Sequence, residues 1–196
     1  HATDLERLAR IPALTAVSVR RLALSDLTPL IGDAPLLWLD VADTPVSDLR
    51  PLAYVRGLQQ FSCGGTHVSD LGPLAHLTGL QYLNCGRTHV SDPKPLAHVT
   101  ALQHLVCSHT RVSDLSPLSH VAGLQRLDCG STHVSDLKPL ARVTGLQHLD
   151  CSITPVSDLE PLAHLEQLKD LNCMYTLVSD LKPLAYVTGL QHLDCS

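Results

Sequence analysis

The chain has 196 residues, of which 44% are hydrophobic and 17% are charged, and its formal net charge is −5. This composition is typical of a folded chain rather than a disordered one, and the acidic balance offers no basic surface for a phosphate backbone, so nucleic acid is not an expected partner. No apolar run approaches the roughly 18 residues of a membrane span, so membrane insertion is not expected either. Aromatic residues make up only 3% of the chain, which predicts a core of aliphatic side chains and thiols.

A unit of 22 residues repeats along the chain. The triplet Val-Ser-Asp begins at residue 46 and returns every 22 residues up to residue 178, and the seven cysteines from Cys63 to Cys195 keep the same spacing. A period held without insertion indicates a solenoid, in which each unit buries its apolar side against its neighbours.

We expect residues 1–196 to form one domain that has three parts. Residues 1–13 form a partial N-terminal unit, residues 14–189 form eight 22-residue units, and residues 190–196 form a final strand. The first full unit is irregular, because Asp33 stands where other units have an apolar side chain. Since the chain begins at His1 and stops within a repeat, we expect it to be a fragment of a longer protein.

Each unit contains two predicted elements. Residues 148–151, His-Leu-Asp-Cys, predict a short parallel strand in which His148 and Asp150 face outward while Leu149 and Cys151 face inward. The outer arc at 135–145 predicts one short turn of helix or 3-10 structure, capped by Asp136 and ended by Gly145.

The unit at 80–101, LQYLNCGRTHVSDPKPLAHVTA, resembles a leucine-rich repeat. Leu80, Leu83, Cys85, Thr88 and Val90 follow the pattern L-x-x-L-x-L-x-x-N/C-x-L, with cysteine at the third leucine and threonine at the asparagine. The second half of the unit is similar to the 22-residue repeats of bacterial internalins. The resemblance implies an α/β fold, a right-handed leucine-rich-repeat solenoid or horseshoe, with a parallel sheet on its concave face and short helical or 3-10 turns on its convex face. The threonine column is expected to hydrogen-bond the loop after each strand.

The cysteine column predicts buried, reduced thiols. A buried free cysteine behaves as a small hydrophobe and lets neighbouring coils stack at about 4.8 Å. Disulfides are disfavoured by the odd count and the parallel side-chain directions, and no C-x-x-C pair suggests zinc. We therefore expect no cofactor and a reducing, cytoplasmic compartment, either bacterial or, for a delivered effector, in a host.

The run QHLDCS at 147–152 contains the residue types of a nucleophilic site, but we expect no catalysis within this chain. The predicted strand puts the Cys151 thiol and the His148 imidazole on opposite faces of the sheet, whereas a nucleophile and its base must lie within about 3 Å. The twelve histidines all fall on outward columns. A metal site combining His148 with Asp128 and Asp150 is the alternative, but tyrosine and arginine share these columns, which is typical of solvated surface, and no metal is expected.

Partner choice is expected to lie on the concave face, where two outward columns vary from unit to unit. Trp38, Tyr82, Met174 and Tyr175 are large apolar candidates for binding hot spots, although Trp38 could instead cover the irregular first unit. The aspartates suggest a partner of basic character. The predicted partner-binding residues are Trp38, Asp40, Gln60, Tyr82, His104, Arg126, Asp128, His148, Asp150, Asp170, Met174, Tyr175, His192 and Asp194.

The resemblance implies recognition of a protein partner, as in a bacterial effector, virulence, surface or signalling protein. Two alternatives stay open. The chain could be the substrate-recognition arm of a larger ligase, transferase or GTPase whose catalytic domain lies elsewhere, since no catalytic motif occurs here. It could also be a structural array that assembles through exposed end strands such as 190–196, although a monomer is expected in isolation.

Overall fold

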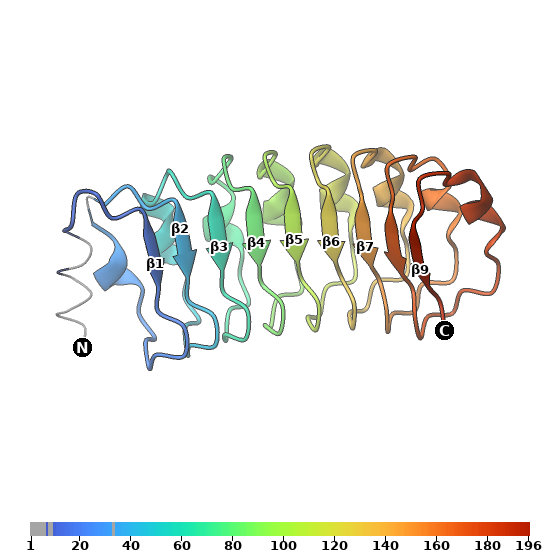
Figure 1. The fold of residues 1–196 in the computed structure, drawn as a ribbon. Coiled ribbons are helices and arrows are strands. Elements are labelled where there is room, and N and C mark those ends of the chain that lie inside the picture. Colours follow the sequence, from blue (N-terminus) through green and yellow to red (C-terminus); the bar gives the residue numbers. More distant parts are fainter. Residues whose placement is uncertain (1–6, 8–9, 33) are drawn as a thin grey trace.

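The computed structural model describes Arg7, residues 10–32 and residues 34–196; most of the predicted partial unit 1–13, with His1, and also Asp33 lie outside the described residues. Nine parallel strands of three residues each form one sheet in sequential order, and Figure 1 shows them in a single row. The strands are β1 (Ala16–Ser18), β2 (Trp38–Asp40), β3 (Gln60–Ser62), β4 (Tyr82–Asn84), β5 (His104–Val106), β6 (Arg126–Asp128), β7 (His148–Asp150), β8 (Asp170–Asn172) and β9 (His192–Asp194).

Each strand pairs with the residues 22 positions further along the chain. Arg126 lies beside His148, and Leu127 beside Leu149, in a register that repeats from β1 to β9. The crossovers pass behind the sheet in the right-handed sense that parallel connections favour. The predicted right-handed leucine-rich-repeat solenoid with a parallel sheet is confirmed.

The core lies between the sheet and the outer arc. Within β7, Leu149 points inward and is 2% exposed, while His148 and Asp150 on either side are only half-buried, as the alternation predicted. Leucine, valine and cysteine fill the interior, and Phe61 is the only phenylalanine among them. None of the helices in the described ranges is long and apolar enough to cross a membrane.

Six of the seven cysteines form a buried column along this core. Cys63, Cys85, Cys107, Cys129, Cys151 and Cys173 are 0–3% exposed, whereas Cys195 is exposed in the last coil. All seven are free thiols. Some of them donate hydrogen bonds to the next coil, as Cys85 Sγ does to the Val106 carbonyl at 3.4 Å. Cysteine therefore packs here as a small hydrophobe with a weak donor.

Threonine hydroxyls hold the loops that follow β2 to β8. Each hydroxyl donates to the backbone carbonyl three residues earlier at 2.5–2.7 Å, as Thr132 does to Cys129. Only one donor is needed at this position, so threonine can replace the asparagine of the leucine-rich-repeat pattern. The predicted column of hydroxyl bonds is confirmed.

The same loops place one residue per coil in the left-handed region. The φ angles are +52 to +58° at Arg21, Asp43, Arg87, His109, Ser131, Ile153 and Tyr175, and +70° at Gly65. This conformation is unfavourable for residues with a Cβ, and most unfavourable for a β-branched one. Ile153 is therefore the most strained of these positions.

Replacing Ile153 with asparagine is expected to stabilise the protein. Ile153 is 55% exposed, so little packing is lost, and asparagine tolerates the left-handed region. Equilibrium urea unfolding should show a gain of about 1 kcal/mol for Ile153→Asn. Ile153→Val keeps the β-branch and is expected to give no gain. An equal gain in both variants would contradict the strain explanation.

The outer arc consists of short 3-10 turns, which Figure 1 shows behind the sheet. A proline lies in the first two positions of each of these turns, and the aspartate two residues before the turn accepts a hydrogen bond from the first residue's amide at 2.7–2.9 Å. Asp136 thus bonds the start of the turn at 138–142, as predicted, but from one residue before the N-cap position, which is Leu137. The turns are η1 (Thr28–Leu30), η2 (Arg50–Tyr54), η3 (Gly72–Leu74), η4 (Lys94–His98), η5 (Ser116–His120), η6 (Lys138–Arg142), η7 (Glu160–Leu162) and η8 (Lys182–Tyr186).

Gly145 does not end the turn, contrary to the prediction. The η6 turn already ends at Arg142, where the Val143 amide donates to the Leu140 carbonyl at 2.9 Å. Gly145 instead lies against the neighbouring coil, where a Cβ would come within 3.3 Å of the Ala122 carbonyl oxygen. Its small size serves the stacking of coils rather than a change of backbone direction.

Candidate recognition surface

Two columns of side chains cover the outward surface of the sheet, which we call the strand face. The first column is formed by the first residue of each strand and the second column by the third residue, because alternate strand residues point to the same side. From β2 to β9 the first column runs Trp38, Gln60, Tyr82, His104, Arg126, His148, Asp170 and His192. The second column runs Asp40, Ser62, Asn84, Val106, Asp128, Asp150, Asn172 and Asp194.

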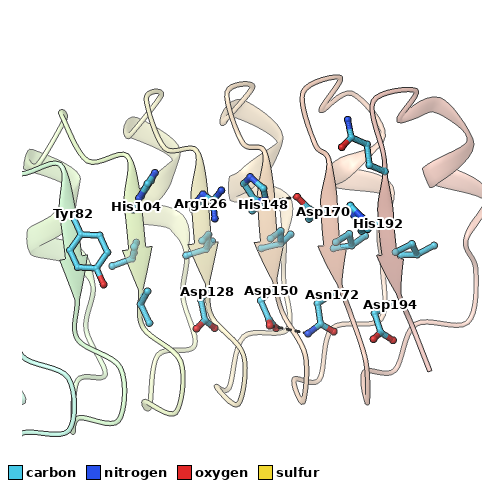
Figure 2. A pocket seen from close by; sticks show the side chains of 17 residues that line it. Tyr82, His104, Arg126, Asp128, His148, Asp150, Asp170, Asn172, His192 and Asp194 are labelled. Carbon is cyan, nitrogen blue, oxygen red and sulfur yellow. Dashed lines mark hydrogen bonds and ion pairs between the residues drawn. The ribbon is translucent and has the colours of Figure 1, made fainter. Parts of the chain in front are cut away.

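A shallow groove of about 970 Å³ extends over the strand face from β4 to β9. Figure 2 shows its second-column members in a row below those of the first column. The groove brings together nine of the predicted residues: Tyr82, His104, Arg126, Asp128, His148, Asp150, Asp170, His192 and Asp194. Six strands at about 4.8 Å spacing make a surface about 24 Å long.

The other five predicted residues lie outside this groove. Gln60 lines a smaller hollow with Tyr82 and His104, and Trp38 is half-buried on β2. Asp40 is only 5% exposed, and its Oδ2 lies 3.6 Å from the Arg20 guanidinium, so it is already partnered within the chain. Met174 and Tyr175 lie in the loop after β8, where Tyr175 is 72% exposed.

Eight residues outside the predicted set also line the groove: the central leucines of β5 to β9 and, with polar or outward side chains, Val106, Asn172 and Gln191. Val106 and Asn172 occupy the second column, so the strand alternation alone could have identified them. Gln191 precedes β9, at a position where glutamine recurs from unit to unit, which made it look like repetitive scaffold.

The acidic second column has a structural role that the sequence interpretation missed. Each Asp or Asn in this column accepts a hydrogen bond from the amide two residues further on, at 2.9–3.4 Å, as Asp150 does from Ser152. Such side chains stabilise the turn into the loop. The signal was present, because Asp and Asn favour this local bond and they replace one another at most positions of the column.

In two of these carboxylates the second oxygen also accepts a hydrogen bond. Ser108 Oγ donates to Asp128 Oδ2 at 2.7 Å, and Asn172 Nδ2 donates to Asp150 Oδ2 at 2.9 Å. These bonds link neighbouring coils and hold both carboxylates in place. The second-column carboxylates in the groove are therefore hydrogen-bond acceptors that the fold already holds in place.

Asp170 lies between two imidazoles in the first column. His148 Nδ1 contacts Asp170 Oδ2, and His192 Nδ1 lies 2.6 Å from Asp170 Oδ1. The three side chains come from the consecutive strands β7, β8 and β9. The His148 ring thus turns toward Asp170 rather than toward Asp128 and Asp150, the pair considered for a metal site. No group of three or more potential metal ligands occurs in the part of the chain that the structure describes.

His104 lies in the N-terminal half of the groove, between Tyr82 and Arg126. Burial lowers the pKa of His104, and the nearby positive charge of Arg126 and the His148 imidazole lower it further. The rings of Tyr82 and His104 meet edge to face, with centroids 6.4 Å apart. A neutral imidazole beside an aromatic ring and a guanidinium makes this part of the groove less acidic than its C-terminal end.

The thiols and the imidazoles lie on opposite sides of the sheet. Cys151 is fully buried and its Sγ donates to the Asn172 carbonyl at 3.5 Å, while His148 lines the outward groove. None of the eleven histidines within the described residues is buried. The predicted separation of Cys151 from His148 is confirmed, so QHLDCS contains no paired nucleophile and base.

Comparisons with known proteins agree with this geometry. Residues 100–142 match a family model described as leucine-rich repeats in two copies. An internalin from Listeria monocytogenes, inlF, matches at 26% identity with a TM-score of 0.87, over 97% of this chain and 64% of that chain. Internalin C2 from the same organism matches at 26% identity with a TM-score of 0.88, over 100% of this chain and 84% of that chain.

A leucine-rich-repeat protein from Leptospira interrogans shares the fold, with a TM-score of 0.89 at 16% identity over 97% of this chain and 51% of that chain. No curated protein matches the chain by sequence. The chain spans about two-thirds of the length of inlF and half that of the Leptospira protein. The repeat, the parallel sheet and these matches together identify the chain as a leucine-rich-repeat solenoid that is similar to the Listeria internalins.

Proposed function

We propose that the chain is a bacterial recognition module that binds a protein partner through its strand face. The observation that carries this proposal is the variation along the first column, where aromatic, basic, acidic and amide side chains follow one another while the inward columns repeat leucine, valine and cysteine. Packing would favour the same residue in every coil. Extended solenoid surfaces are widely used for binding, and a variable column of side chains on such a surface is expected of a binding site.

The dimensions and composition of the groove support the same proposal. A length of about 24 Å suits one side of a standard protein interface of about 800 Å². Tyr82 and Arg126 lie in its N-terminal half, and tyrosine and arginine are enriched among the residues that dominate binding energy. The fixed second-column carboxylates add polar acceptors that need little ordering when a partner binds.

Capture of partners from bacterial and host lysates would test the proposal. The unmodified chain is compared with the strand-face variant Tyr82→Ala/His104→Ala/Arg126→Ala and with the outer-arc control His76→Ala/His98→Ala, each checked for folding by circular dichroism. We expect one or more proteins, quantified by mass spectrometry, to be captured by the unmodified chain and the control and lost from the strand-face variant. Equal capture by all three proteins, or capture by none, would contradict recognition through this face.

We also propose that the chain works in a reducing compartment such as the cytoplasm. Six buried thiols stacked one per coil support this, because oxidation of any of them would place polar oxygens in the core. A thiol count on protein unfolded without reductant, directly after isolation from its native cell, should give seven. A lower count would contradict the proposal.

A further inference from the structure

We propose that His148, Asp170 and His192 form a site that accepts an arginine side chain of the partner when the imidazoles are neutral and rejects it when they are protonated. This inference rests on the proposed recognition function and names the chemistry of one contact within it. The site occupies the C-terminal part of the groove, over β7, β8 and β9.

Asp170 determines which nitrogen of each ring carries the proton. Both of its oxygens are occupied by an Nδ1 atom, one from His148 and one from His192. A carboxylate accepts hydrogen bonds, so each neutral ring must hold its proton on Nδ1. The Nε2 atom of each ring, which lies at the far end of the side chain, is then left with a lone pair. Asp170 is thus a positioning residue that makes both imidazoles acceptors.

The surroundings of the pair are also rich in acceptors. The Asp150 and Asp194 carboxylates lie in the second column of the same strands, with Asn172 between them. Lys169 precedes Asp170, but its Nζ donates to Gln147 Oε1 at 3.1 Å. A ligand that fits such a site carries several hydrogen-bond donors and a positive charge. The planar guanidinium of arginine meets this requirement better than the compact ammonium of lysine.

Protonation removes the net negative charge of this half of the strand face. The charged groups over β6 to β9 are the cations Arg126 and Lys169 and the carboxylates Asp128, Asp150, Asp170 and Asp194, which leave two negative charges in excess. Protonating His148 and His192 adds two positive charges and cancels this excess. Both Nε2 atoms also become donors, so the site loses its imidazole acceptors and its net negative charge in the same step.

Nitrogen NMR of the ring tautomers tests the positioning by Asp170. At about pH 7.5, ¹⁵N shifts should show His148 and His192 protonated on Nδ1 and unprotonated on Nε2. In Asp170→Asn the side-chain amide offers one acceptor and one donor, so one of the two rings should move its proton to Nε2. Asp136→Asn on the outer arc removes the same charge and should leave both rings unchanged. Unchanged tautomers in Asp170→Asn would overturn the assignment.

Fluorescence anisotropy with labelled hexa-arginine tests the binding itself. We expect Asp170→Asn to weaken binding at about pH 7.5 by about fivefold relative to Asp136→Asn, because a half-exposed charge is partly screened. Acidification to about pH 5.5 should weaken binding to the unmodified chain by at least the same factor. His148→Gln/His192→Gln should bind hexa-arginine at both pH values with little difference, while the outer-arc control His76→Gln/His98→Gln should keep the full pH dependence.

Failure of the arginine site and failure of the proposed function give different results. Equal binding of hexa-arginine by Asp170→Asn and Asp136→Asn, the same pH dependence in both histidine variants, or equal affinity for hexalysine would overturn the arginine site. If hexa-arginine behaves as expected while the lysate partner is still captured by Tyr82→Ala/His104→Ala/Arg126→Ala, the arginine site stands and recognition through the whole strand face fails.

Discussion

Raising the pH from 9 to 10 is expected to remove about 8 kcal/mol of stability, enough to unfold the protein. The cause is the buried thiol column: burial raises the pKa of Cys85 and Cys151 to about 12 and that of Cys173 to about 11, and it raises the pKa of the other buried thiols as well. In the unfolded chain a thiol ionises near pH 8.5.

The direction follows from proton linkage. Between about pH 8.5 and the raised values, the folded state keeps protons that the unfolded state has released, so unfolding is favoured as the pH rises. Each thiol contributes about 1.4 kcal/mol per pH unit in this window, and six are buried. The stabilising effect is fully present below about pH 8.5. Urea unfolding at a series of pH values measures the slope directly.

Replacing buried cysteines with valine tests the role of the thiol column. Val19 and Val41 occupy the same column in the first two coils and are buried there, so valine fits this position. Cys107→Val/Cys129→Val removes two of the six buried thiols and should lower the pH slope by about one third. Cys195→Ser changes the exposed thiol and should leave the slope unchanged. A slope in the double variant equal to that of the unmodified chain would contradict the thiol explanation.

Phe61→Ala is expected to cost about 3–5 kcal/mol of the free energy of unfolding. Phe61 is fully buried at the centre of β3, between Leu39 on β2 and Leu83 on β4. Because each coil contacts only its neighbours, the cavity cannot be filled by distant residues. Equilibrium urea unfolding followed by circular dichroism measures the loss.

Replacing Phe61 with leucine, which loses less volume than alanine does, separates the effect of the lost volume from the effect of changing the residue type. The neighbouring coils already use leucine at the equivalent position, so Phe61→Leu should cost less than about 1.5 kcal/mol. If Phe61→Ala lost no more stability than Phe61→Leu, the tight packing of this coil would be contradicted.

The 22-residue period made most of the fold predictable. A strict repeat means that each residue has an equivalent neighbour one coil away, so the inward direction of Cys151 in one unit holds for the whole cysteine column. The same argument placed Thr132 in the loop and Asp136 at the turn. Gly145 was misinterpreted because glycine suits both a helix end and a close approach of two backbone segments, and only the position of Ala122 in the preceding coil distinguishes them.

The candidate site was less predictable because side-chain orientation depends on the neighbouring coil. The alternation of the strand predicted that His148 faces outward, but not that its ring turns toward Asp170, because that choice depends on the identity of one residue in the next strand. The same alternation predicted that Asp40 faces a partner. Its carboxylate instead pairs with the guanidinium of Arg20 from the preceding coil. Such side-chain pairings vary from coil to coil, so the repeat pattern does not predict them.

Site-specific photocrosslinking tests the central claim, recognition through the strand face, most directly. A photoreactive phenylalanine is placed in turn at positions 82, 104 and 126 of the first column and at positions 76, 98 and 142 of the outer arc. We predict that a captured partner crosslinks only from the first set, because these side chains line the groove while the others lie on the opposite surface. Crosslinks from the outer arc alone, or equally from both sets, would contradict the claim.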